Sequence, residues 1–188
     1  MAEADLTKAC LMYFVVPLWI AAGFADWLCH RASHIERNAG ARESLLHLLL
    51  LGESSIPVLA ALFLEINAGV LALALTALVL HQITAMVDVE YATTVRVVSP
   101  NEQHVHGFLE VIPLMAMVLV VILHWPQFLS LFGLGPERAD FSINLKDPPL
   151  PLPYLVAVLA AIFLLDVAPY LEELWRCLRA SRPRLRAT

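Results

Sequence analysis

Histidines and carboxylates recur at helical spacing between residues 26 and 110 of this chain. Asp26, His30 and His34 are each four residues apart, so they would share one face of a helix. His106 and Glu110 have the same spacing. Imidazole nitrogens and carboxylate oxygens are the usual protein ligands of iron, manganese and zinc. The pattern therefore predicts a metal site built from the faces of helices.

The same segment holds further residues of these types, and we include them in the predicted ligand set: His47, Glu53, His81, Asp88 and His104. Six histidines together with several carboxylates exceed the four ligands of one tetrahedral zinc ion. We therefore expect two metal ions, with iron favoured and zinc as the alternative. Some of the carboxylates are expected to bridge the ions or to hold a ligating imidazole by its second nitrogen.

The elements that would position these residues are hydrophobic helices. Of the 188 residues, 60% belong to the broad hydrophobic class and only 15% are charged, which is too apolar for a soluble domain of this size. Five stretches are long enough to span a bilayer, at about 8–30, 44–65, 68–90, 106–124 and 153–172. We predict an all-α, integral-membrane bundle of about five transmembrane helices in a single domain, with an external loop at about 125–152.

The distribution of basic residues predicts the orientation in a cytoplasmic (inner) membrane. With the first loop inside, the cytoplasmic side carries Arg31, Arg37, Arg42, Arg96, Arg176, Arg179, Arg182, Arg184 and Arg186. The outside then carries only Lys8, Arg138 and Lys146. This bias places the N-terminus outside and the C-terminus in the cytoplasm. The basic tail adjoins the last span, so membrane lipids are its expected partner and nucleic acid is not.

This topology brings the polar residues to one level of the membrane. The first and third spans run inward and the second and fourth run outward, so their polar ends all meet at the cytoplasmic face. Three glutamates near that face are interpreted as partners of arginines: Glu36, Glu90 and Glu102. In the last span, Asp166 is expected to be buried, whereas Glu172 and Glu173 are expected to face water or neighbouring arginines.

Two histidine pairs resemble motifs of a known family. The segment His30-x-x-x-His34 is similar to the first histidine box of the membrane-bound, histidine-rich di-iron desaturases, hydroxylases and alkane monooxygenases. His104-Val105-His106 stands in the place of a later box, although the HxxHH form is absent. The resemblance implies a non-haem di-iron centre that uses dioxygen to hydroxylate or desaturate a lipophilic small molecule. Such chemistry requires an external electron donor, since the chain contains no flavin or nicotinamide fingerprint.

Three other functions use the same residues. A zinc-dependent intramembrane hydrolase would use metal-bound water as nucleophile, with Glu53 or Glu110 as base. A metal or proton transporter would use the polar residues as a path, but it predicts polar residues across the whole membrane. A haem b protein would hold its iron by two histidines on neighbouring helices, for instance His30 and His81.

Overall fold

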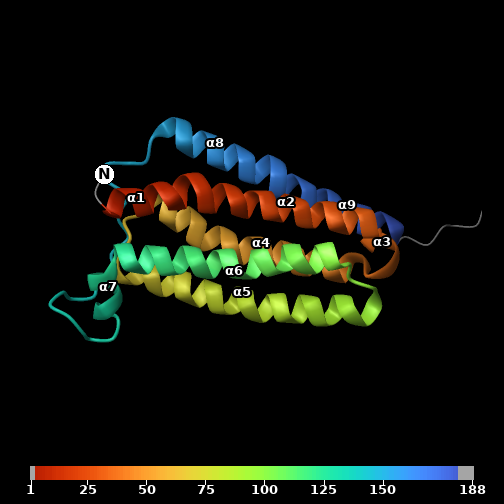
Figure 1. Cartoon of the computed structure of the whole chain (residues 1–188), viewed down its shortest axis with the longest axis horizontal. Coiled ribbons are helices and arrows are strands. Elements are labelled where there is room, and N and C mark those ends of the chain that lie inside the picture. The colour runs from red at the N-terminus through yellow and green to blue at the C-terminus, as the bar shows by residue number, and fades with distance from the viewer. Residues whose placement is uncertain (1–2, 182–188) are drawn as a thin grey trace, which may run out of the picture.

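The computed structural model describes residues 3–181 and forms a bundle of five long antiparallel helices (Figure 1). In chain order these are α1 (Glu3–Cys10) with η1 (Leu11–Val15) and α2 (Val16–Ser33), α4 (Gly40–Phe63), α5 (Ala68–Val95), α6 (Pro100–Leu123), and α8 (Leu152–Ile162) with η2 (Phe163–Val167) and α9 (Ala168–Ala180). The η elements are single π-helical turns within continuous helices. Short helices α3 (Ile35–Asn38) and α7 (Trp125–Ser130) lie at opposite ends of the bundle.

All five long helices are long and apolar enough to cross a membrane, which confirms the predicted all-α bundle of five transmembrane helices. Their bounds extend beyond the predicted spans, mainly at the end of the bundle where α3 lies. There α5 continues to Val95 and α9 to Ala180. The predicted spans were too short at that end because they followed apolar runs, whereas α4, α6 and α9 also include buried charged residues there, namely Glu43, Glu102 and Glu173.

The exterior of the bundle is apolar and part of its interior is charged. Met86, Phe163 and Leu164 are 73%, 57% and 63% exposed, whereas Glu43 and Glu173 are fully buried. In water such an arrangement would be costly, because apolar surface would be exposed and charges desolvated. In a bilayer the apolar exterior contacts lipid, and the charged groups are kept away from it.

Local sequence signals explain where several helices begin and end. The Asn67 side chain accepts a hydrogen bond from the Val70 amide at 3.1 Å and caps α5. Ser99 does the same for the Glu102 amide at 3.2 Å, directly before Pro100 begins α6. Three basic residues of the predicted cytoplasmic tail lie outside the described residues: Arg182, Arg184 and Arg186.

Two cavities lie between the helices. The smaller, of about 310 Å³, is nearer the α3 end, and the larger, of about 610 Å³, extends toward the α7 end. Pro57 lies inside α4 and Pro113 inside α6, and both line the larger cavity. A proline inside a helix removes one backbone hydrogen bond and bends the helix, so these residues help to separate the helices at that level.

Candidate metal centre

Two histidines from neighbouring helices form the centre of the polar cluster. The rings of His30 in α2 and His47 in α4 stack with their centroids 4.1 Å apart and an interplanar angle of 6°. Glu173 in α9 contacts both rings on the same edge, with Oε2 3.2 Å from Nδ1 of His30 and Oε1 2.8 Å from Nδ1 of His47. An ionised carboxylate only accepts hydrogen bonds, so both Nδ1 atoms carry the proton. In the neutral imidazoles both Nε2 atoms then have free lone pairs.

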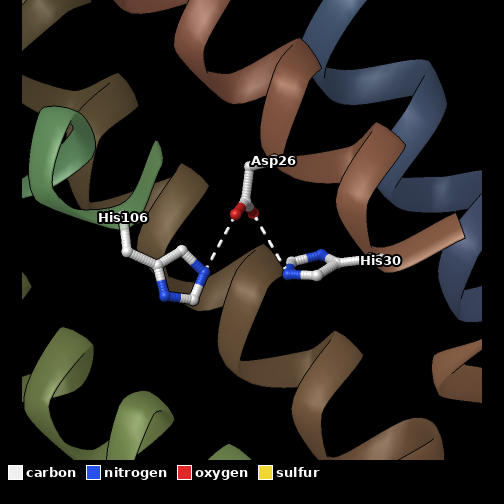
Figure 2. A group of neighbouring side chains, drawn as sticks. All are labelled: Asp26, His30 and His106. Atoms are coloured by element: carbon white, nitrogen blue, oxygen red, sulfur yellow. Dashed lines mark ion pairs between the residues drawn. The ribbon is translucent and has the colours of Figure 1, made fainter. Parts of the chain in front are cut away.

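The Nε2 edge of His30 faces carboxylates of two helices. Asp26 Oδ2 and Glu102 Oε1 each lie 3.4 Å from this nitrogen. The second oxygen of Asp26 is 2.9 Å from Nε2 of His106 in α6, so one carboxylate lies between two imidazoles (Figure 2). The Tyr170 hydroxyl donates a hydrogen bond to Asp26 Oδ2 at 3.0 Å. These contacts hold the Asp26 carboxylate in one orientation.

The Nε2 edge of His47 has a similar environment. Asp88 Oδ1 in α5 lies 3.4 Å from this nitrogen, and Glu43 Oε1, one helical turn before His47, lies 3.9 Å away. Because the two stacked rings present their Nε2 edges in the same direction, the group of side chains around His30 Nε2 lies beside the group around His47 Nε2. Together these residues could hold metal ions, and we call them the metal cluster: Asp26, His30, Glu43, His47, Asp88, Glu102 and His106.

Several ligand-type atoms in the metal cluster are buried without a hydrogen-bond partner. Among the described residues these include Nε2 of His30, Nε2 of His47 and Oδ1 of Asp88. Buried polar atoms are nearly always paired, so three unpaired atoms at one place call for a bound group. Ligand atoms converge within 4.8 Å of one another in two overlapping sets, Asp26–His30–His106 and His30–Glu43–His47. This donor set fits cations that accept nitrogen and oxygen ligands.

Arg96, at the end of α5, connects two carboxylates of the metal cluster. Its Nε lies 3.0 Å from Glu43 Oε1 and its Nη1 3.0 Å from Glu102 Oε2, while Nη2 contacts both glutamates. Burial alone would lower the pKa of Arg96, but the hydrogen bonds to Glu102 and Glu43 raise it above its ordinary value. The guanidinium is therefore permanently charged, and it fixes the two carboxylates relative to each other.

Half of the ten residues predicted as ligands come together in the metal cluster: Asp26, His30, His47, Asp88 and His106. Three others lie deeper between the helices: Glu53, His81 and Glu110. His81 and Glu110 line the smaller cavity, and Glu53 and His81 line the larger one. Along the helix, His81 precedes Asp88 by two turns, or roughly 10 Å.

The remaining two predicted residues lie outside the buried cluster. α2 ends at Ser33, and His34 adopts a left-handed conformation with φ of 54°, so the helical spacing from His30 does not continue. The His34 side chain is 61% exposed and lies 3.4 Å from Glu36. His104 is exposed, and its ring packs edge-on against Phe108.

Sequence reasoning missed Glu43 and Tyr170, and its prediction for Glu173 was wrong. Glu173 was expected to face water or arginines, but it is fully buried between the two histidines. Its neighbour Glu172 does pair with an arginine, Arg31, at 2.9 Å. A signal was present: Asp166, Tyr170, Glu173 and Cys177 recur at helical spacing, and all four are buried.

The expected pairing of Glu102 with Arg96 is confirmed, and the same carboxylate also faces His30. Sequence spacing also held a signal that Glu43 and Glu102 belong to the metal cluster. Glu43 precedes His47 by four residues, and Glu102 precedes His106 by four, as Asp26 precedes His30. Each of three helices thus carries a carboxylate and an imidazole on one face.

The smaller cavity adjoins the metal cluster. Asp26, His47, Asp88 and His106 line one part of it. Aliphatic and aromatic side chains line most of the rest, including Leu51, Leu59, Leu159, Ile162 and Phe163. An apolar ligand in this cavity would therefore contact side chains of the metal cluster directly. Comparisons of the chain with models of known families, with curated proteins and with solved structures found no match.

Proposed function

We propose that this protein is an integral-membrane metalloenzyme that binds two iron ions in the metal cluster and uses dioxygen to oxidise a lipophilic substrate. The observation that carries the proposal is the stacked pair of His30 and His47. Glu173 holds both rings by Nδ1, and both Nε2 atoms stay buried and unpaired among carboxylates. A carboxylate behind a ligating imidazole is the usual support of a protein metal ligand.

The ring geometry favours two ions. Ions bound at the two Nε2 atoms of rings stacked 4.1 Å apart would themselves be separated by about that distance. Two-metal catalytic sites have ions about 3.5–4 Å apart. One ion would have His30 with Asp26, Glu102 and His106, and the other would have His47 with Asp88 and Glu43. A carboxylate at the boundary can bridge both.

The charge of the buried groups also favours two divalent ions. Five carboxylates are buried here: Asp26, Glu43, Asp88, Glu102 and Glu173. The single positive charge of the Arg96 guanidinium neutralises only one of these negative charges. Four negative charges remain, and two divalent cations would balance them. Buried charges without compensation are very costly, so the bundle requires positive charge here, either as metal or as protons on the histidines.

Iron is favoured by the mixed ligand set and by the cavity. Non-haem iron uses imidazole and carboxylate ligands and activates dioxygen at open coordination positions. The residues supply the remaining conditions: Tyr170 orients Asp26, the apolar wall excludes water, and the smaller cavity brings a hydrocarbon against the ligands. An electron donor outside this chain would supply the electrons. The positive-inside rule would place the metal cluster at the cytoplasmic side of an inner membrane, with the N-terminus outside.

Metal analysis of the purified protein, together with optical spectroscopy, tests this proposal. The expected result is about two irons per chain, and His30→Ala is expected to lose metal. His34→Ala is a matched control at the end of the same helix. It is expected to keep both ions, because this side chain is exposed and apart from the cluster. Circular dichroism of both variants would show that the helices persist.

The outcomes separate the rival functions. Stoichiometric zinc without iron would contradict the oxidation and support the hydrolase. A Soret band would support the haem protein. Protein that binds no metal, even after incubation with ferrous iron or zinc, would refute the metal centre and leave protonated histidines as the source of positive charge.

A further inference from the structure

The two cavities adjoin at a polar site in the otherwise apolar middle of the bundle. Five residues line both cavities: Val16, Trp19, Ser54, Val58 and His81. Around this junction lie Glu53, Ser54, His81 and Thr84, which we call the polar waist. It lies between α4 and α5, and none of its residues belongs to the metal cluster.

The hydrogen bonds of the polar waist leave one strong acceptor unused. Thr84 Oγ1 donates to Glu53 Oε1 at 2.9 Å, and the Ser54 hydroxyl lies 3.2 Å from Nδ1 of His81. The second carboxylate oxygen of Glu53, Oε2, is buried and has no hydrogen-bond partner. An unpaired acceptor in an apolar interior is costly, and a ligand that donates a hydrogen bond would remove this cost.

We propose that the polar waist binds the hydroxyl group of a long-chain alcohol whose hydrocarbon lies in the two cavities. The hydroxyl would donate to Glu53 Oε2. When Ser54 donates to Nδ1 of His81, the imidazole proton is on Nε2, which would donate to the hydroxyl oxygen. An ether or carbonyl oxygen can only accept, so it would leave Glu53 unsatisfied. The waist therefore selects a hydroxyl over these groups.

This inference rests on the proposed function, because it names the class of substrate that the metal cluster would oxidise. Glu53 follows His47 by six residues and His81 precedes Asp88 by seven. These separations correspond to roughly 10 Å along the helices. The waist would thus hold the hydroxyl at a fixed distance from the metal cluster and so determine which carbon of the chain is oxidised. The larger cavity would hold the other part of the chain.

Quenching of tryptophan fluorescence can measure this binding in the full-length, detergent-solubilised protein. Trp19 lines both cavities, so a bromine atom on a bound chain would lie close to its ring. The probes are a long-chain alcohol that carries its hydroxyl within the chain and a bromine a few carbons from it, and the methyl ether of the same alcohol. A Trp19→Phe variant gives the background from the other tryptophans. The alcohol is expected to bind about tenfold more tightly, which is the effect of one hydrogen bond to a charged group.

Glu53→Gln tests the origin of this preference. The variant removes the carboxylate charge and is expected to bring the two affinities to within about twofold of each other. Glu65→Gln is the matched control, because Glu65 lines the larger cavity away from the waist and is exposed. It is expected to keep the wild-type ratio. Glu53→Leu is a second variant in case Glu53→Gln does not fold: it replaces the buried carboxylate by an apolar side chain of similar size, and it is also expected to abolish the preference because no acceptor remains.

The result can be separated from that of the proposed function, because metal content is measured independently on the same samples. Equal affinities of the wild-type protein for alcohol and ether would overturn the hydroxyl site even with two irons bound. An unchanged preference in Glu53→Gln or in Glu53→Leu would also overturn it. A wild-type preference lost in Glu53→Gln, with metal content unchanged, would support it.

Discussion

The metal cluster and the polar waist are two buried polar sites between the same helices, and they differ in how their side chains are supported. In the cluster, Glu173 holds two imidazoles from behind, and carboxylates meet their free nitrogens. In the waist, His81 and Glu53 each have one side-chain hydrogen bond, to Ser54 and to Thr84. The described ligand groups that converge within 4.8 Å include neither His81 nor Glu53.

The difference shows that residue type alone does not distinguish a metal site from a hydrogen-bonding site. Both sites contain histidine and glutamate side chains from neighbouring helices. Only the cluster combines several convergent ligand atoms with a partner that fixes the imidazole proton on the opposite nitrogen. Substitutions in the cluster should therefore weaken metal binding, whereas substitutions in the waist should leave metal binding unchanged.

The largest effect is expected from Glu173→Gln. The amide has one carbonyl oxygen, so it can accept from one imidazole only, and the other ring must change its tautomer and lose a free Nε2. We expect at least a tenfold loss of metal affinity at one of the two positions. A loss of about 3 kcal/mol in the free energy of unfolding should accompany it, as when a buried charged pair is broken. Metal titration and denaturant unfolding measure the two effects.

Glu172→Gln is the control for this variant. Glu172 is the adjacent residue, and it pairs with Arg31, whose side chain is 54% exposed. We expect a change in stability below about 1 kcal/mol and unchanged metal binding. Wild-type metal affinity in Glu173→Gln would contradict the role assigned to this carboxylate.

A somewhat smaller effect is expected from Arg96→Met. The substitution leaves Glu43 and Glu102 without their common partner, so the metal-free protein should lose about 2–3 kcal/mol of unfolding free energy. Bound cations would compensate part of this charge, so added metal should raise the melting temperature of the variant more than that of the wild type. Arg42→Met is the control, because Arg42 is exposed and stacks on Tyr91. Equal stabilisation by metal in both variants would disprove the charge argument.

The end of the bundle at which the polar residues meet could be predicted from the sequence. Alternating helix directions are enough to bring Asp26 and His106 to one level, although they are eighty positions apart. The separation of the cluster from the waist could not be predicted in this way. Helix direction does not show which side chains converge, so His81, two turns before Asp88, was included in the single predicted ligand set.

The sequence pattern also did not show where the backbone departs from a regular α-helix. Glu173 follows η2, a π-helical turn that contains one extra residue and shifts the face that α9 presents to the bundle. His34 lies one residue beyond the end of α2, where a left-handed backbone interrupts the periodicity. The left-handed residue ends the helical face of Asp26 and His30 before His34, whereas the spacing of Tyr170, Glu173 and Cys177 within α9 did carry a signal for the buried glutamate.

A moderate effect is expected from Gly23→Ala, beside the metal cluster. A Cβ at this position would lie 2.6 Å from Oδ1 of the buried Asp166 side chain, so this side chain or the two helices would have to shift. We expect a loss of about 2 kcal/mol, in the range of overpacked cores, and weaker metal binding because Tyr170 also bonds to the Gly23 carbonyl. Gly52→Ala, in open space next to the waist residue Glu53, should be neutral or slightly stabilising. Equal stability of the two variants in thermal unfolding would contradict this difference.

The smallest effect on metal binding is expected from His81→Ala. His81 has the same residue type as His106 and faces the same cavity, but its one side-chain hydrogen bond is to Ser54. Metal stoichiometry in His81→Ala should equal that of the wild type, whereas His106→Ala should weaken binding, since His106 contacts Asp26 at 2.9 Å. Loss of metal from His81→Ala would show that the waist and the cluster are parts of one metal site. Retained metal together with weaker binding of the alcohol would show that the metal cluster binds the ions and the polar waist positions the substrate.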